Sequence, residues 1–379
     1  MSMTVVLLAG AGLLMRSFVE LSSVDPGFEA RGTLAVRLNM PDQSFSWQER
    51  SELLPRVREA VSSLPGVVAV GATAIDPFSG NNLSNFVARL DRLPDRAADF
   101  TPIAWRPVTP GFFKAMGMEL KAGRTFIDSD GGEGLGQMVI GESLARRTWG
   151  GEDPIGQILV WGDPGGSRNL VVGVVEDLRD VGLAETAQPI VYLPHRRVPW
   201  AVMTLVARVQ GDPTTVAAGI RTRIQEVIPG VPIPEIRSLE ENLHMAVAQP
   251  RFNLQLLASF AAVGLLMAVL GIYGLTAFEV RRRFREIGIR LTLGANPDGI
   301  RTMIFRQRMR LTAVGAGVGL VIARVLSRWI ESSLYGITAN DPMTWIGVLS
   351  VVAGASALAA YLPARKATQV HPRDVLSGD

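Results

Sequence analysis

The sequence predicts an α-helical membrane bundle joined to an α+β domain outside the membrane, and three observations lead to this prediction. Leu254–Phe278 is a run of 25 residues without a charged side chain, and three consecutive arginines follow it at 281–283. Two further apolar runs lie downstream, at about 309–330 and 343–362. About 20 apolar residues cross a bilayer as a helix. Residues 22–249 contain no run of that kind, so this stretch is expected to fold in water.

Composition agrees with a mixture of membrane and aqueous parts. Of the 379 residues, 47% are hydrophobic and 19% are charged, and the net charge is only +3. Because the basic excess is local, we do not expect nucleic acid as a partner. The chain has no cysteine and three histidines, which excludes disulfides and cysteine-based metal or redox sites. No metal site and no cofactor are therefore expected.

The first apolar stretch, Met1–Leu14, is followed by Arg16 and is too short to span alone. A basic start and a small-residue cleavage site are both missing, which argues against a signal peptide. We interpret residues 1–21 as a transmembrane helix whose first turns lie upstream of Met1.

Short strands and helices alternate irregularly in the aqueous stretch. Apolar alternation predicts a strand at 33–39, and a second strand is expected at 66–75. Between them, 47–64 has a helical stripe that Pro55 should kink or shorten. Polar loops are expected from there to Trp105. The remaining strands are predicted at 138–140, 170–175, 189–194 and 202–209, and the remaining helices at 143–149 and 213–228.

Asp212 and Pro213 are well suited to the N-cap and first turn of that last helix. Because strands and helices are mixed without a regular β-α alternation, an α+β domain of one or two lobes is the natural prediction.

A basic segment follows the first full span at 254–280. Residues 281–310 hold nine arginines and two acids. One helical face carries the apolar side chains Phe284, Ile287 and Leu291. On another face Glu286 can pair with arginines four residues away on either side, one of them Arg290. Gly294 can end this short helix, and Asn296 with Pro297 can start the next.

The distribution of Lys and Arg sets the topology. The 281–310 segment and the tail after 362 are basic, so both are expected in the cytoplasm. The loop at 331–341 has two acids and no Lys or Arg, so it lies outside, as does the 22–249 domain. Arg324 and Arg328 fall in the last turns of the 309–330 span, where long side chains can reach the interface.

This layout resembles the permease halves of MacB/FtsX-type ABC transporters, and most closely the C-terminal half of their duplicated orphan permeases. The most specific stretch is GIYGLTAFEVRRRFREIGIRLTLGA at 271–295. Weaker stretches add to it and lie at 7–41, 108–126, 139–157, 171–183, 189–194, 341–342 and 362–372. The resemblance implies an FtsX-like four-span permease with a MacB-like periplasmic domain at 22–249 and an FtsX-like domain at 250–379.

The resemblance also implies partners and a site. Permeases of this kind do not hydrolyse ATP. A cytoplasmic ABC ATPase subunit receives their short cytoplasmic helix in a groove, and its closure moves the outer domain. Here that coupling helix would be 282–293, with the ATPase contacts Phe284, Glu286, Ile287, Arg290 and Leu291. A second permease half, as a homodimer or a fused half, is implied as well, together with membrane lipids, an extracytoplasmic partner and a bacterial inner-membrane location.

The chain departs from the family pattern at three places: the short first helix, Pro55, and Gly141, where a polar residue such as Asn is expected. Two other functions stay open. An FtsX-like regulator of an extracytoplasmic partner, such as a cell-wall hydrolase, would share this layout. A membrane-anchored serine hydrolase would use Ser143 in Gly141–Ala145, with His195 or His244 and Asp177 or Asp180. No G-x-x-x-x-G-K-[ST] sequence occurs, so the chain has no P-loop.

Overall fold

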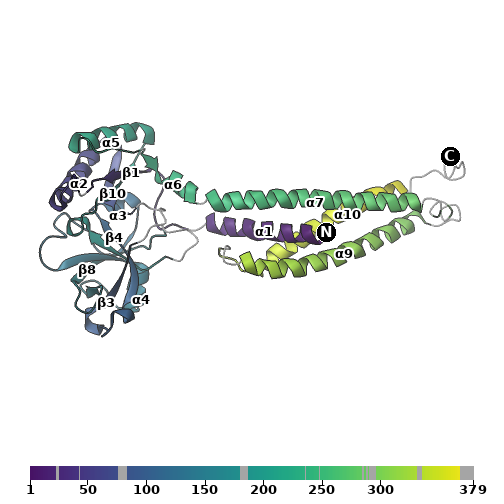
Figure 1. Cartoon of the computed structure of the whole chain (residues 1–379), viewed down its shortest axis with the longest axis horizontal. Coiled ribbons are helices and arrows are strands. Elements are labelled where there is room, and N and C mark those ends of the chain that lie inside the picture. The colour runs from purple at the N-terminus through teal and green to yellow at the C-terminus, as the bar shows by residue number, and fades with distance from the viewer. Residues whose placement is uncertain are drawn as a thin grey trace. The chain divides into compact units, whose positions relative to one another are not determined.

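The computed structural model describes residues 1–22, 25–41, 43–75, 83–179, 187–234, 236–246, 248–283, 286, 289, 296–330 and 335–367. The chain forms two units, a helical unit of Met1–Ser23 with Ala248–Asp379 and an α+β unit of Val24–Val247. Figure 1 labels their elements. Each unit has a hydrophobic core of its own.

The first lobe of the α+β unit is a four-stranded antiparallel sheet with strand order β11-β1-β10-β2. Its elements are β1 (Thr33–Asn39), α2 (Trp47–Ser62), β2 (Val67–Thr73), β10 (Val202–Val209), α5 (Pro213–Val227) and β11 (Arg237–Ser238). Two β-α-β units thus interleave as in the ferredoxin-like fold. The short helices α3 (Phe112–Met116) and α6 (Leu239–Ala246) also contact this sheet.

Helices α2 and α5 form where the sequence supplies caps and an apolar stripe. Ser46 and Glu49 make a capping box at the start of α2. Asp212 accepts a hydrogen bond from the Thr214 amide at 3.0 Å with Pro213 in the first turn of α5, as predicted. Both helices bury their stripes against one face of the sheet, through Leu54, Val57, Val61, Ile220 and Ile224.

The second lobe is inserted between β2 and β10. Its strands are β3 (Leu83–Arg89), β4 (Thr101–Val108), β5 (Leu120–Gly123), β6 (Gly136–Gly141), β7 (Ile158–Trp161), β8 (Arg168–Val175) and β9 (Ile190–Pro194). The pairings β4–β3–β7–β8–β6–β9–β4 close a six-stranded ring, and β5 pairs with β8 beside it. Helix α4 (Glu142–Trp149) follows β6, and three short 3-10 helices complete the lobe, η1 (Leu90–Arg92), η2 (Ala97–Asp99) and η3 (His195–Arg197).

The expectation of polar loops between residue 75 and Trp105 was wrong in part. Strand β3 and the first half of β4 lie there, and they pair with each other over five residues. Strand β3 carries Ser84, Asn85 and Arg89, and η2 and several charged residues separate it from β4, so neither strand shows a clean period of two. Their pairing partners β7 and β9 lie far along the chain. Closure of the ring, rather than local pattern, therefore stabilises these strands.

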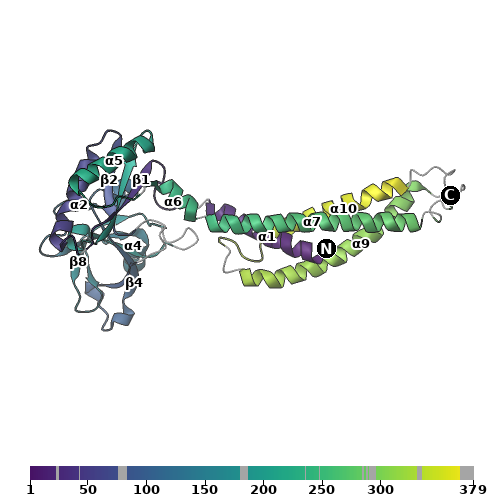
Figure 2. The same ribbon diagram turned by 45° about the horizontal axis from the view of Figure 1, so that its top comes forward.

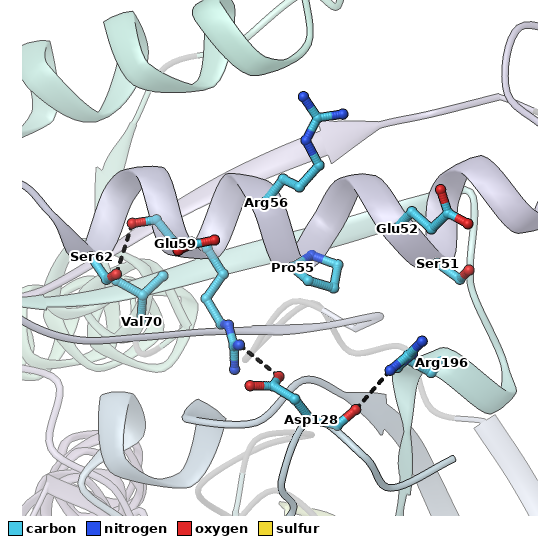
Figure 3. Close-up of a pocket in the computed structure, with 10 residues that line it drawn as sticks. Ser51, Glu52, Pro55, Arg56, Glu59, Ser62, Val70, Asp128 and Arg196 are labelled. Carbon is cyan, nitrogen blue, oxygen red and sulfur yellow. Dashed lines mark hydrogen bonds and ion pairs between the residues drawn. The ribbon is translucent and has the colours of Figure 1, made fainter. Parts of the chain in front are cut away.

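Of the two effects expected of Pro55, a kink or a shorter helix, the second was wrong, because α2 runs through Pro55 to Ser62. A proline removes the N–H that would bond the carbonyl four residues earlier, here that of Ser51. Ser51 and Pro55 both line an open pocket of about 650 Å³, shown in Figure 3. Water in this pocket can satisfy the freed carbonyl, while the buried Leu54 and Val57 fix the opposite face of the helix.

In the described part of the helical unit, four long helices pack as a bundle. They are α1 (Ser2–Ser22), α7 (Ala248–Arg282), α9 (Pro297–Ile330) and α10 (Pro342–Ala367). Helix α1 contacts the other three, and α10 packs on both α7 and α9. Figure 1 shows α1 between the two longest helices, α7 and α9, and Figure 2 shows it crossing behind α7. These four helices are each long and apolar enough to cross a membrane, so the expectation that the first one is too short to span alone was wrong.

Small residues bring the helices of the bundle close together. A Cβ added to Gly319 of α9 would lie 2.8 Å from Val5 Cβ and 2.9 Å from Ser2 Cα of α1. The Ser2 hydroxyl donates to the Gly315 carbonyl at 2.9 Å, and the Thr4 hydroxyl to that of Gly264 at 3.3 Å. Glycine contacts and interhelical hydrogen bonds of this kind are typical of helices that associate in lipid.

Candidate functional site in the helical unit

Glu279, in the last turn of α7, connects α7 directly to α9. Arg308 of α9 forms a close ion pair with the Glu279 carboxylate and also donates to the Leu275 carbonyl at 3.2 Å. Arg283 lies 3.2 Å from the second carboxylate oxygen. Helices α7 and α9 otherwise pack mainly on α1 and α10. This ion pair therefore fixes their spacing at the end where the chain leaves α7 and enters α9.

The Glu279–Arg308 pair is mostly buried, with 28% of the Glu279 side chain and 15% of the Arg308 side chain exposed. Charge-assisted hydrogen bonds of this kind are stronger than neutral ones, and partial burial reduces their screening by salt. Sequence reasoning missed the pair. Arg308 is one of nine arginines in a basic segment, and nothing in the local pattern distinguishes it as the partner of Glu279.

The predicted ATPase contacts follow directly after this pair. Phe284, Ile287, Arg290 and Leu291 lie outside the described residues, whereas Glu286 is described as helical and exposed. On the far side of the segment, the Asn296 side chain accepts a hydrogen bond from the Asp298 amide at 2.9 Å, with Pro297 in the first turn of α9. The predicted cap is confirmed, and the segment is bounded by an ion-paired helix end and a capped helix start.

The hydrolase alternative places its nucleophile in the α+β unit, at Ser143 in α4. The Ser143 hydroxyl donates to Asp177 Oδ1 at 2.9 Å, and its amide lies 3.0 Å from both Asp177 oxygens. His195 is engaged elsewhere, with Nε2 3.2 Å from the Arg50 carbonyl, and His244 lies on the exposed face of α6. Asp180 lies outside the described residues. Among the described residues, the Ser143 hydroxyl thus donates to a carboxylate, and no contact to His195 or His244 as its base is present.

The same contacts account for the glycine at position 141. Gly141 is the N-cap of α4 and has no side chain to cap the helix, and Asp177 supplies the cap instead. A Cβ at Gly141 would lie 2.7 Å from Asp177 Oδ1 and 2.8 Å from Ile190 Cγ2. Gly141 therefore leaves room for Asp177, and Asp177 caps α4 in its place.

The pocket of Figure 3 lies between the two lobes of the α+β unit. Arg58 of α2 pairs with Asp128 at 2.6 Å, and Arg196 donates to the Asp128 carbonyl at 2.8 Å. The Arg58–Asp128 pair joins α2 to the second lobe across the pocket, and the Arg196 contact holds Asp128 within that lobe. Among the described residues, no group of three or more His, Asp or Glu side chains is placed to hold a metal ion.

Four apolar helices bundled through glycine contacts, together with a large α+β unit, define a multi-pass membrane protein with a sizeable water-exposed domain. Comparison with family models identifies both parts. Residues 2–226 match the MacB-like periplasmic core domain, and residues 258–372 match the FtsX-like permease C-terminal domain. The chain belongs to the MacB/FtsX permease family, with its α+β unit as the periplasmic domain. The predicted fold class is thereby confirmed.

Individual relatives are distant. The chain is 25% identical over 297 residues to the macrolide export ATP-binding/permease protein MacB of Rhodopseudomonas palustris, covering 71% of this chain and 42% of that protein. It is 25% identical over 370 residues to the probable syringafactin export ATP-binding/permease protein SyfD of Pseudomonas syringae pv. tomato, covering 83% and 52%. The chain thus spans about half the length of the curated relatives it matches.

Among solved structures, the periplasmic region of MacB from Actinobacillus actinomycetemcomitans aligns with 59% of this chain and 95% of its own. The sequence identity is 14% and the TM-score is 0.39. Membership of the family therefore rests on the family models, which together cover most of the chain.

Proposed function

We propose that this chain is the permease subunit of an ABC export system and that a cytoplasmic ATPase drives it through residues 282–293. The observation that carries the proposal is the position of this segment, between the Glu279–Arg308 pair and the Asn296 cap. Phe284, Ile287 and Leu291 would enter an apolar groove on the ATPase, with Glu286 and Arg290 as polar contacts. Two relatives, of which this chain covers about half the length, are named as ATP-binding/permease proteins, and this supports an ATPase partner.

The proposed location is the bacterial inner membrane, with the C-terminus in the cytoplasm. Segment 281–310 and the tail beyond 362 hold the basic clusters, and the positive-inside rule assigns such clusters to the cytoplasmic side. Counting back from these basic segments, the MacB-like domain, proposed at 22–249, would lie outside. The remaining FtsX-like domain, 250–379, would then carry three spans at about 254–280, 309–330 and 343–362.

The proposed mechanism is transmission of motion rather than passage through a channel. A 35-residue helix such as α7 is about 50 Å long at 1.5 Å per residue, enough to carry a displacement across a bilayer. Closure of the ATPase would shift segment 282–293, and the Glu279–Arg308 pair would make α7 and α9 respond together. Helix α7 follows the periplasmic domain in the chain, so its movement would reach that domain directly.

A second permease half, either another copy or a fused half, completes the proposed transporter, and membrane lipids surround it. Efflux or extraction of a substrate at the periplasmic domain is the proposed outcome. The relatives are named for export of macrolides and syringafactin, and a large amphipathic molecule is the substrate class that we propose from those names. An extracytoplasmic partner would receive the substrate.

The proposal is tested by co-purification. The chain would be co-expressed with each ATPase encoded near its gene, extracted in detergent and isolated through a tag on the permease. Glu286→Arg and Ile287→Asp are the test variants. Glu133→Arg is the matched control, because Glu133 is an exposed acid on a turn of the periplasmic domain.

We expect an ATPase to co-purify with the wild type and with Glu133→Arg, and its recovery to fall about tenfold or more with both test variants. Melting curves would confirm that the variants stay folded. If the test variants retain the ATPase, the coupling residues are wrong. If no ATPase binds the wild type, the export proposal is wrong, and an FtsX-like regulator becomes the function to test.

A further inference from the structure

Asp341 makes an unusual double contact at the start of α10. Its Oδ2 accepts hydrogen bonds from the Thr344 amide at 2.9 Å and from the Thr344 hydroxyl at 2.6 Å, with Pro342 in the first turn. It is therefore the N-cap of α10. The same oxygen also accepts a hydrogen bond from Arg16 Nη1 of α1 at 2.6 Å. One carboxylate thus caps one helix and binds another.

The loop before Asp341 lies against the same end of α1. The Ser17 hydroxyl oxygen accepts a hydrogen bond from the Tyr335 amide at 2.7 Å, and Ser17 is 6% exposed. Gly336 has φ +67°, and a Cβ there would lie 2.5 Å from Glu20 Cγ. Positions 16, 17 and 20 share one side of the last turns of α1. The end of α1 therefore meets this loop through several contacts rather than through a single ion pair.

A second Asp-Pro cap in the same chain shows that capping does not require the arginine. Asp212 caps α5 with Pro213 in the first turn, and it accepts from the Thr214 amide at 3.0 Å and from the Thr214 hydroxyl at 2.8 Å. Within the described residues, the side chain of Asp212 accepts from Thr214 and Thr215 and from no arginine. The pairing of Arg16 with Asp341 is thus additional to the cap and connects two helices 325 residues apart.

We propose that Arg16–Asp341 and Ser17–Tyr335 form an outer latch, which makes the end of α1, the 335–341 loop and the start of α10 move as one body. The inference rests on the proposed function and adds a second route for the motion. Helix α1 precedes β1 in the chain, so a displacement of α9 and α10 would reach the periplasmic domain through the latch. Arg16 is a positioning residue in this account, because it acts by holding α1 on α10.

Separation of α1 from α10 would have to break several contacts at once. Arg16 would lose its carboxylate, Asp341 would keep only its cap donors, and the Tyr335 amide would lose the Ser17 oxygen. Asp341 has only 11% of its side chain exposed, so water could not fully replace Arg16. The latch is therefore expected to stay closed while the bundle moves.

The first test uses hydrogen exchange of the full chain in detergent, followed by mass spectrometry. Arg16→Gln removes the charge, and Asp341→Asn keeps an N-cap acceptor while weakening the bond to Arg16. Each variant should speed exchange at the start of α10 by about tenfold, and the double variant should be no faster than either single one. Arg16→Lys should restore slow exchange. Asp212→Asn is the matched control and should leave α10 unchanged.

An effect on α10 from a change in α1 is the critical result, because a purely local role of Arg16 would not produce it. The latch is excluded if Arg16→Gln leaves the exchange of α10 unaltered, or if the two single effects add. These outcomes do not depend on an ATPase, so they decide the latch even if the export proposal fails.

The second test uses the absence of cysteine from the chain. Ser17→Cys with Tyr335→Cys is the pair to crosslink, because the Ser17 hydroxyl lies 2.7 Å from the Tyr335 amide, and formation of the disulfide would be verified by mass spectrometry. In a separate variant without the crosslink, a fluorophore on Gln225→Cys, on the exposed side of α5, reports on the periplasmic domain. With the ATPase bound, the crosslinked permease should stimulate ATP hydrolysis as the reduced form does. Arg16→Gln should retain the ATPase but lose most of the ATP-dependent fluorescence change. Arrest of hydrolysis by the crosslink, or a normal fluorescence change in Arg16→Gln, would overturn the rigid latch.

Discussion

His195 should make the stability of the periplasmic domain depend on pH between about 6.5 and 4. The imidazole is 1% exposed and lies at the contact between η3 and α2, with Nε2 3.2 Å from the Arg50 carbonyl. Nδ1 is buried without a hydrogen-bond partner. Burial lowers the pKa of His195 from its ordinary 6.5 to about 4, and this exceeds the opposing effect of the Arg50 carbonyl.

The sign follows from proton linkage. Below pH 6.5 the unfolded chain binds a proton at this histidine and the folded chain does not, so folding loses stability as the pH falls, until the folded pKa near 4 is passed. The shift from 6.5 to about 4 corresponds to about 3 kcal/mol at 1.36 kcal/mol per pKa unit. For a domain of this size that is on the order of 6–12 °C in melting temperature.

The measurement is the melting temperature of the full chain in detergent, followed by tryptophan fluorescence at pH values from 7.5 to about 3. His195→Gln is the test variant, because its amide can still donate to the Arg50 carbonyl and does not titrate. Between pH 6.5 and 4, we expect the melting temperature to fall in the wild type and in the exposed control His244→Gln. In His195→Gln this fall should be absent. Hydrogen bonds from Thr214 lower the pKa of Asp212, and protonation of such carboxylates in stronger acid should still destabilise all three proteins. An equal slope in His195→Gln would refute the assignment.

Two further predictions concern packing in the same domain. Leu54→Ala should destabilise the domain by about 2–5 kcal/mol in chemical denaturation, since Leu54 is fully buried between α2 and the sheet, whereas the exposed Leu120→Ala should have little effect. Gly71→Ala should prevent normal folding, because a Cβ there overlaps the backbone of Phe112. Gly219→Ala is its counterpart in α5, where the Cβ would meet only Leu64 at an ordinary 3.4 Å, and it should raise stability by up to about 1 kcal/mol.

Local chemistry in the sequence was sufficient to predict many elements. Alternation predicted β1 at 33–39, and the Asp212–Pro213 pair predicted the start of α5. It was not sufficient for β3 and β4, whose stability comes from a ring that closes through strands far along the chain. Pro55 failed as a helix breaker for a related reason, since tertiary packing of Leu54 and an open pocket at Ser51 outweigh one lost hydrogen bond.

The candidate site likewise has a part that local sequence could predict and a part that it could not. Its cap at Asn296 could be predicted because helix capping is a local property. The apolar stripe of Phe284, Ile287 and Leu291 stays a prediction, because these residues lie outside the described part of the chain. The partners of Glu279 and Asp341 could not be predicted, because a charged side chain carries no local signal that selects one arginine among many. The residues expected to contact the ATPase, apart from Glu286, lie outside the described residues, and their role stays a prediction.

The two units differ in what determines their internal geometry. In the periplasmic domain, burial of side chains such as Leu54 is worth about 1.5–3 kcal/mol each and selects one packing. In the helical unit, only 6% of the most apolar stretch of α7 is buried inside the structure, and Leu266 and Phe278 are exposed. Lipid is as apolar as these side chains, so their contacts cannot choose between alternative packings. The positions of its helices are therefore determined by the contacts inside the bundle, which are the close approaches at glycines, the small buried core around Val5 and Val348, and the Glu279–Arg308 and Arg16–Asp341 pairs.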